Sequence, residues 1–425
     1  MVAHFTTIMK GIIVQQISVG CWPIDKGSEL KNKIYRIYAW VILILYTIKI
    51  ILEFTYICGH TGNVFVLGEM FIIFFTGVLF QIRILNIFYR SVDYQNLMIF
   101  FRDKISLTEY WDPSKKSMKI AMDQEREAKY LVMLFTVMFT FGYFIFFILT
   151  VYMNFISGSY EKDSDVPMLS PFTLALPFDT QFNKVNWSFT YVAECIFGYI
   201  CLGSVLCQDV MLCYIILHVI GHLKIMVCKL KQLHVISKSL DEHYDDLYDM
   251  EQIRDMKDVE KSWTEYSEED ENFIYAKMID CLLHHALILR FFSDMQNVFG
   301  LIFFTNFLYD VSCICLLGFQ MTSALIYTVI RFSLFFMGAV ARLIMICYYC
   351  DQLAAESRKL CEAVYCSNWP SLSARCKSSL YFFLMRTQIP LQFSAMGFLS
   401  VTVETMSMIL KSSFSYFTIL RSFDE

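Results

Sequence analysis

Polar side chains recur at a fixed spacing within the last apolar stretch of this sequence. Four residues stand four positions apart and would share one face of a helix: Lys411, Ser415, Ile419 and Phe423. Lipid does not solvate ammonium or hydroxyl groups, so such a face is expected to border a water-filled path or another helix. Glu404 precedes Lys411 by seven residues on the same face. It would either attract cations along a conduction path or form a salt bridge at a subunit interface.

Other ionisable residues interrupt apolar stretches, where each is expected to need a partner. They are Lys49, Glu53, Glu69, Glu194, Asp209, Asp310, Arg331 and Arg342. Lys49 and Glu53 are four apart on one helix and should satisfy each other. Asp310 and Arg331 lie about ten residues on either side of a turn near residue 320. We therefore predict a structural ion pair between these two residues on neighbouring antiparallel helices.

No arrangement of nucleophile and base, and no metal-ligand spacing, stands out in the chain. Most of the 15 cysteines lie within apolar stretches, where cysteine usually acts as a small hydrophobic residue. The segment between Asn154 and Glu194 contains no cysteine, so we expect no disulfide framework. We expect no catalytic residues, no metal and no cofactor.

The composition predicts an all-α integral membrane protein, because 56% of the residues are hydrophobic and only 18% are charged. A membrane-spanning helix needs about 20 predominantly apolar residues. Seven stretches meet this need, at approximately 37–57, 64–87, 130–154, 188–218, 296–318, 324–350 and 393–421. Arg290 and Asp294 precede the fifth span, and the fourth is expected to continue as a helix below the membrane. An amphipathic piece, 378–390, ends at Pro390 and is expected to form the first half of a broken seventh helix.

Lysine and arginine in the loops indicate the orientation of these spans. The N-terminal segment and the loops 88–129, 219–284 and 351–379 together contain 25 of them, whereas the alternate loops contain two. The N-terminus is therefore predicted to be cytoplasmic and the C-terminus extracellular. We expect no signal peptide, because residues 1–36 lack a long apolar core. A sequon at Asn186 falls in a predicted outer loop, where it could be glycosylated.

One cytoplasmic segment is strongly acidic. Residues 241–271 contain 14 acidic and three basic side chains. Such a segment is usually solvated, although it could also concentrate cations below a pore. At the other side of the membrane, aromatic and small residues gather at the outer ends of spans two, three, four and six. They predict either ordinary helix packing or a pocket for a small, apolar, volatile-sized ligand.

Several short motifs, in order, resemble those of the insect odorant receptor family. In the C-terminal third they are Tyr348-Tyr349-Cys350, Ser357, Ala363, Tyr365, Trp369, the segment LMRTQIP (384–390) and the terminal FSYFTILRS (414–422). Near the start, Gly20-Cys21-Trp22-Pro23 resembles the motif before the family's first span. Gustatory receptors have Thr-Tyr and Gln-Phe where this chain has Ser415-Tyr416 and Ser422-Phe423, so the odorant family is favoured. A G-protein-coupled chemoreceptor and a gustatory-type receptor remain the alternatives.

The resemblance implies a subunit of a ligand-gated, non-selective cation channel that forms a heterotetramer with an odorant coreceptor in the plasma membrane of sensory neurons. It implies pore positions at Ser415, Ile419, Ser422 and Phe423, with Ile419 narrowing the path. It also implies an odorant site in the outer half of the bundle. The residues expected to contact the odorant are Ile72, Phe75, Thr76, Phe144, Phe147, Ile148, Val151, Ile196, Tyr199, Phe332 and Phe335.

The same resemblance divides the chain into six regions. These are a cytoplasmic segment (1–36), spans one to four with the ligand region (37–218), and a cytoplasmic extension with the acidic loop (219–295). Spans five and six (296–350), a cytoplasmic anchor for assembly (351–392) and a pore-lining helix (393–425) follow.

Overall fold

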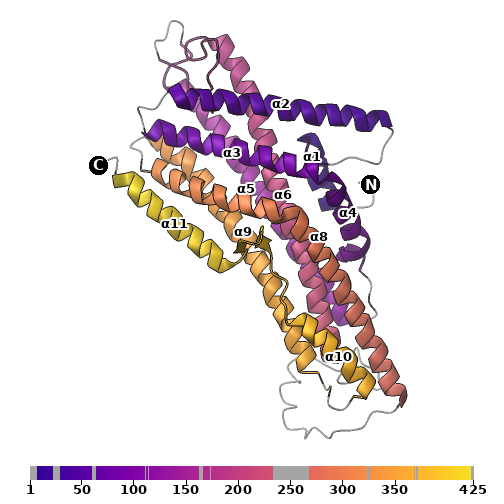
Figure 1. The fold of residues 1–425 in the computed structure, drawn as a ribbon. Helices are drawn as coiled ribbons and strands as arrows, with labels where there is room; N and C mark the ends of the chain where they lie inside the picture. Colours follow the sequence, from indigo (N-terminus) through magenta and orange to yellow (C-terminus); the bar gives the residue numbers. More distant parts are fainter. Residues whose placement is uncertain are drawn as a thin grey trace.

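The protein is a bundle of long α-helices, seen here in a computed structural model (Figure 1). The structure describes residues 7–22, 29–59, 64–110, 112, 114–161, 166–172, 174–232, 268–322, 326–367, 369 and 372–422. The acidic segment therefore lies largely outside the described residues, and its predicted role stays a prediction.

In the described part of the chain, six helices are long and apolar enough to cross a membrane. They are α2 (Glu29–Gly59), α3 (Val64–Tyr89), α5 (Lys115–Ile156), α6 (Lys184–Gln232), α8 (Glu268–Gln320) and α9 (Ile326–Tyr365). They contain the first five predicted spans and the sixth from Ile326 onward, and the expected continuation of the fourth span is confirmed, since α6 runs to Gln232. The charged start of α5 is fixed by Ser114, whose hydroxyl accepts a hydrogen bond from the backbone of Ser117 at 3.4 Å.

The predicted seventh span begins ten residues later than expected. Its helix is α11 (Val403–Ser422), whereas Ser394–Ala395 (β1) and Leu399–Ser400 (β2) pair as an antiparallel hairpin. Met396 and Gly397 in the hairpin turn have positive φ angles of 53° and 81°, which a helix does not allow. The prediction from 393 was wrong because apolarity alone does not separate a short hairpin from a helix. The predicted break itself is present, since α10 (Ala374–Thr387) ends before Pro390.

The long helices begin and end at the two ends of the bundle. The last turn of α11 lies at the same end as the last turns of α2 and α8 and the first turns of α3 and α9, and α1 (Thr7–Ser18) lies near the opposite end of α2 (Figure 1). This arrangement agrees with an odd number of crossings. We call the end with the last turn of α11 the outer end, following the predicted orientation.

At the inner end, shorter elements fill the space below the spans. These are α4 (Ser91–Phe100), a π-helical turn η2 (Phe101–Ile105) and a 3-10 turn η3 (Leu107–Glu109). Trp22 packs against Tyr94 of α4, with ring centroids 5.6 Å apart. The inner parts of α6, α8 and α9 continue into a narrower stalk that α10 joins (Figure 1).

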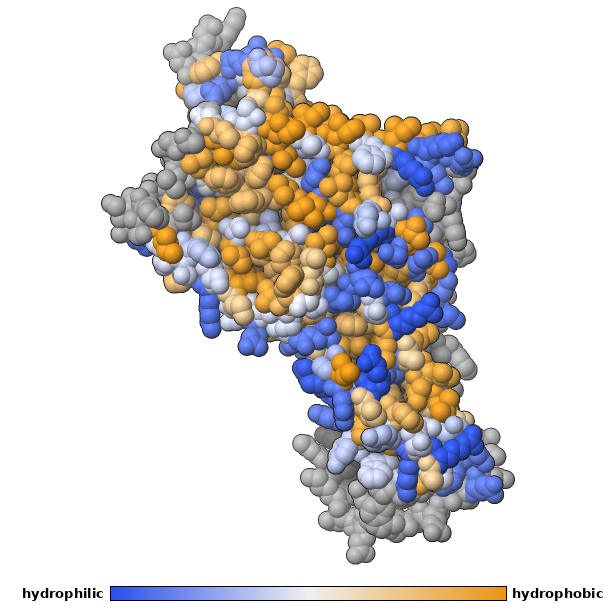
Figure 2. Space-filling view, in the orientation of Figure 1, coloured by the Kyte–Doolittle hydropathy of each residue, from blue (hydrophilic) through white to orange (hydrophobic). Residues whose placement is uncertain are grey.

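The broad upper body carries extensive apolar surface, whereas hydrophilic residues are more frequent towards the stalk (Figure 2). Ile37, Ile44 and Ile51 of α2 and Met133 and Val137 of α5 are more than half exposed. Apolar surface of this extent is typical of contact with lipid and not with water.

Candidate functional site

An aromatic cluster occupies the outer half of the bundle between α5, α6 and α9. Phe146 packs edge-on against Phe335, with ring centroids 4.9 Å apart, and against Phe147 at 5.2 Å. Phe172, from the connection between α5 and α6, lies about equally far from both α5 rings, at 6.1 and 6.0 Å. Tyr191 of α6 adds a further ring 6.2 Å from Phe147. We call these five residues the aromatic cluster.

Arg331 forms the polar border of the aromatic cluster. Its guanidinium carbon lies 4.5 Å from the ring centroid of Phe146, a favourable cation–π geometry. Its Nη1 donates to Glu69 of α3 at 2.6 Å, and its Nη2 donates to the carbonyl oxygen of Pro171. One buried side chain thus connects α9, α3 and the outer connection that carries Phe172.

The predicted ion pair between Asp310 and Arg331 is wrong. Arg331 pairs with Glu69, and Asp310 pairs with Arg342. Arg331 pairs with Glu69 because α3 lies beside the outer part of α9, where the long arginine side chain reaches the Glu69 carboxylate. The predicted pair of Lys49 and Glu53 is confirmed, with 2.5 Å between Nζ and Oε1.

Arg342 belongs to a buried charge network in the middle of the bundle. Asp209 of α6 accepts from Arg83 of α3 at 2.9 Å and from Arg342 of α9 at 3.3 Å. Asp310 of α8 accepts from Arg342, and Asn306 of the same helix accepts from Arg83 at 2.6 Å. Two positive and two negative charges therefore balance, which a low-dielectric interior requires. The network joins four helices.

The structure divides the predicted odorant-contacting residues into two groups. Six are buried or half-buried in the bundle: Ile72, Phe75, Thr76, Phe147, Phe332 and Phe335. Thr76 also lies within hydrogen-bonding distance of Tyr309, 3.1 Å between hydroxyl oxygens. The other five are exposed at the surface of this single chain: Phe144, Ile148, Val151, Ile196 and Tyr199. Their assignment stays a prediction, because a lipid-facing surface is as apolar as a pocket.

Phe147 is held against α6 at a glycine. A Cβ atom at Gly198 would lie 2.7 Å from Cζ of Phe147, whereas a Cβ at Gly142 of α5 would meet no atom within 4 Å. Gly198→Ala should therefore displace the Phe147 ring and raise the half-maximal odorant concentration about fivefold, the effect of ~1 kcal/mol of overpacking. Gly142→Ala is the matched control. Equal dose–response curves for the two variants would show that the Phe147 position is unimportant.

The face of α11 that carries the predicted polar stripe is exposed. Thr405, Ile409 and Ser413 are buried at four-residue intervals, and Ser413 donates to the carbonyl oxygen of Val311 in α8 at 3.2 Å. Lys411, Ser415 and Ile419 lie on the opposite side and are exposed, as is Glu404. Among the described residues, no ion pair joins Glu404 to Lys411. Phe423 and the side chain of Ser422 lie outside the described part.

The predicted sequon is placed at the start of α6. The side-chain amide of Asn186 donates to the carbonyl oxygen of Asp179 at 2.9 Å. Glycosylation would replace one proton of this amide, and it stays a prediction.

Sequence reasoning missed three residues at these sites. Arg83 was overlooked because it stands near the end of an otherwise apolar span, although it is a charge within a membrane segment. Phe172 lies in a connection, and only the fold brings it to the helices. Tyr191 gave a usable signal, since it stands seven residues, about two helical turns, before Gly198.

The chain is similar in sequence to odorant receptors. A sequence model of the family described as 7tm odorant receptor matches residues 63–414. Odorant receptor 85c of Drosophila melanogaster is 29% identical over 165 residues, 39% of this chain and 40% of that protein. Putative odorant receptor 92a is 25% identical over 36% of this chain and 37% of that protein. The match to odorant receptor 13a, at 19% identity, covers 95% of this chain and 92% of that protein.

Solved structures share the fold. The insect olfactory receptor OR5 of Machilis hrabei superposes with a TM-score of 0.77, at 16% identity, over 97% of both chains. The same receptor in complex with eugenol superposes with a TM-score of 0.79 over 99% of both chains.

Proposed function

Because this chain belongs to the insect odorant receptor family, we propose that it is the ligand-tuning subunit of an odorant-gated, non-selective cation channel. The family match decides against the gustatory and G-protein-coupled alternatives. The protein is a multi-pass membrane receptor and not an enzyme. A small apolar volatile molecule binds within the outer half of the bundle, and a coreceptor completes the channel in the plasma membrane of sensory neurons.

The aromatic cluster supports the ligand site. Its rings offer a large apolar contact area, and the guanidinium of Arg331 and the hydroxyl group of Thr76 supply few polar contacts nearby. A mostly apolar lining with a few placed polar groups is typical of a small-molecule site. The structural relative that was solved with eugenol also supports a small organic ligand.

The exposed face of α11 is the observation that supports the channel. A single helix cannot enclose a water-filled path, so several subunits must bring such faces together around one axis. Ser415 would keep the path wettable, and Ile419 would close it by dewetting. Lys411 would oppose cations in the path, so we place its ammonium at the interface between subunits. An odorant that binds more tightly to the open arrangement then shifts the equilibrium toward conduction.

Ile419→Ala tests the pore position. Removing most of this aliphatic side chain should weaken the hydrophobic barrier and raise the current without odorant, or change the relative permeability to cations. Phe414→Ala is the control, because Phe414 is exposed on α11 but lies off the line of Ser415 and Ile419. Unchanged basal current and selectivity in well-expressed complexes would exclude Ile419 from the pore.

A further inference from the structure

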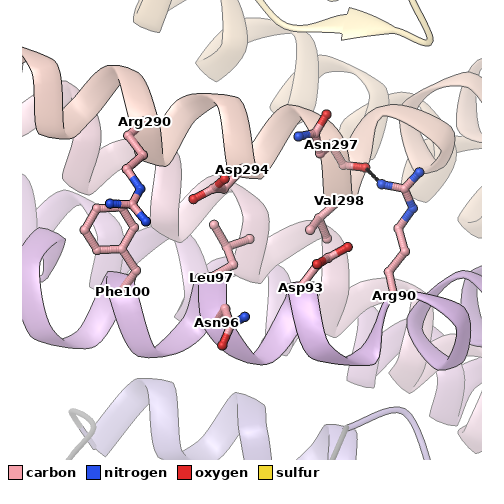
Figure 3. Close-up of a pocket in the computed structure, with 9 residues that line it drawn as sticks. All are labelled: Arg90, Asp93, Asn96, Leu97, Phe100, Arg290, Asp294, Asn297 and Val298. Carbon is pink, nitrogen blue, oxygen red and sulfur yellow. Dashed lines mark hydrogen bonds between the residues drawn. The ribbon is translucent and has the colours of Figure 1, made fainter.

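A second candidate site lies at the inner end of the bundle, away from the aromatic cluster. A cleft of about 440 Å³ opens between α4 and α8 (Figure 3), within the range of about 300–1,000 Å³ that is typical of small-molecule sites. Charged, amide and apolar side chains from both helices line it.

The charges along the cleft have a distinct order. The two carboxylates, Asp294 and Asp93, lie between Arg290 at one end and Arg90 at the other (Figure 3). Arg90 donates from Nη1 to the carbonyl oxygen of Asn297 at 2.5 Å, which ties the start of α4 to α8. Arg290 lies over the ring of Phe100, 5.8 Å from its centroid. Within the described chain, neither carboxylate forms an ion pair.

In the orientation predicted from the loop charges, the cleft lies at the depth of lipid headgroups on the cytoplasmic side. Arg90 directly follows Tyr89, the last residue of the second membrane-crossing helix, α3. Arg290 and Asp294 directly precede the apolar part of α8. Exposed apolar side chains stand beside Arg90 on the chain, since Leu85 is 46% and Tyr89 is 89% exposed. They offer the contact that acyl chains above a bound headgroup would need.

We propose that this cleft binds the headgroup of one phospholipid with a primary ammonium group, represented by phosphatidylethanolamine. The ammonium group has three N–H donors, and the carboxylates of Asp93 and Asp294 accept from it. The phosphate pairs with an adjacent arginine, most directly Arg290, which makes no other ion pair in the described chain. Leu97 and Val298 form the apolar floor.

This chemistry selects against two other occupants. A choline headgroup has no N–H donor and is recognised by open aromatic faces, whereas the aromatic ring that lines the cleft, Phe100, is covered by Arg290. A divalent cation would need six or more oxygen ligands without competing positive charge, and two arginines flank the carboxylates. The apolar side chains at membrane depth favour a lipid over a free amine phosphate.

Binding would brace a segment that leads to α11. The backbone of Asn297 lies one residue beyond Gln296, whose side-chain amide donates to the carbonyl oxygen of Ser394 at 2.6 Å and accepts from its amide at 2.9 Å. A headgroup that bridges α4 and α8 thus stabilises the part of α8 that holds the β1–β2 hairpin.

Native mass spectrometry of the full-length receptor complex tests the proposal directly. The complex is titrated with phosphatidylethanolamine and phosphatidylcholine of identical acyl chains, and bound lipids are counted for each form. The parent chain should bind one phosphatidylethanolamine per copy of this chain about tenfold more tightly than phosphatidylcholine, as expected for charge-assisted hydrogen bonds. Asp93→Asn combined with Asp294→Asn should abolish this preference. Asp280→Asn, an exposed change on the same helix outside the cleft, should retain it.

Three results would overturn the proposal. The parent complex would bind both lipids equally, the preference would persist in the double variant, or soluble phosphoethanolamine would compete as well as the intact lipid. The comparison of the two lipids on the parent chain requires no variant. It therefore tests the preference for phosphatidylethanolamine even if the double variant does not assemble.

Discussion

Arg342→Met is expected to remove most of the receptor from the cell surface. Arg342 is buried and pairs with both Asp209 and Asp310. Asp209 would keep Arg83, but Asp310 would lose its counter-charge inside the bundle. Breaking one side of a buried ion pair typically costs about 3–5 kcal/mol, a large part of the stability of most domains. Surface labelling of tagged receptor measures the effect.

A second substitution separates charge balance from other damage. Asp310→Asn in the Arg342→Met background removes the stranded carboxylate, leaves Arg83 and Asp209 paired, and should restore much of the surface expression. Arg358→Met, an exposed change on the same helix, should have little effect. Normal surface levels of Arg342→Met would show that the network does not hold the bundle together.

Arg331→Met should reduce odorant sensitivity about tenfold while the protein still reaches the surface. Among the described residues, the carboxylate in direct contact with Arg331 is Glu69, which is partly exposed, so loss of Arg331 strands less directly paired buried charge than loss of Arg342. It does release the outer connection at Pro171 and the cation–π contact with Phe146. Loss of hydrogen bonds to charged groups is worth about 1.5–3 kcal/mol each, enough for this shift. Odorant concentration–response curves, normalised to surface expression, report it.

Glu69→Gln separates the ion pair of Arg331 with α3 from its contact with the outer connection at Pro171. It weakens the ion pair to α3 but keeps the contact of Arg331 with Pro171, so it should have a smaller effect than Arg331→Met. If both variants respond like the parent, the outer connection is not held over the ligand site by Arg331. If only maximal current falls, Arg331 acts on opening and not on binding.

The topology could be predicted from the sequence because it depends on composition along the chain. Apolar length and loop charges identify spans without knowledge of their neighbours. The Lys49–Glu53 pair could be predicted for a similar reason, since the geometry of one helix determines it. The partner of Arg331, by contrast, could not be predicted without knowing which helix lies beside it.

The wrong partner predicted for Asp310 shows that the depth of a residue in the bundle does not determine its ion pair. Asp310 lies ten residues before the end of α8, whereas Arg331 and Arg342 lie five and sixteen residues after the start of α9. Position 336 of α9 lies at about the same depth as Asp310. Arg331 and Arg342 are about equally distant from position 336 along the helix, so depth does not favour either arginine as the partner of Asp310. Helix rotation and the nearness of Glu69 decide between them, and neither can be read from spacing. The candidates on α5 and α6 that are exposed show a related limit, because aromatic content does not distinguish a face toward lipid from one toward the interior.

We propose that this chain forms an odorant-gated cation channel together with a coreceptor. The most direct measurement records membrane currents from cells that express this chain alone, an insect odorant coreceptor alone, or both, during application of a broad panel of volatiles. We expect fast odorant-evoked cation currents in the cells that express both chains and not in the other two, and these currents should persist when G-protein signalling is blocked. Responses from this chain alone that disappear under that block would contradict it.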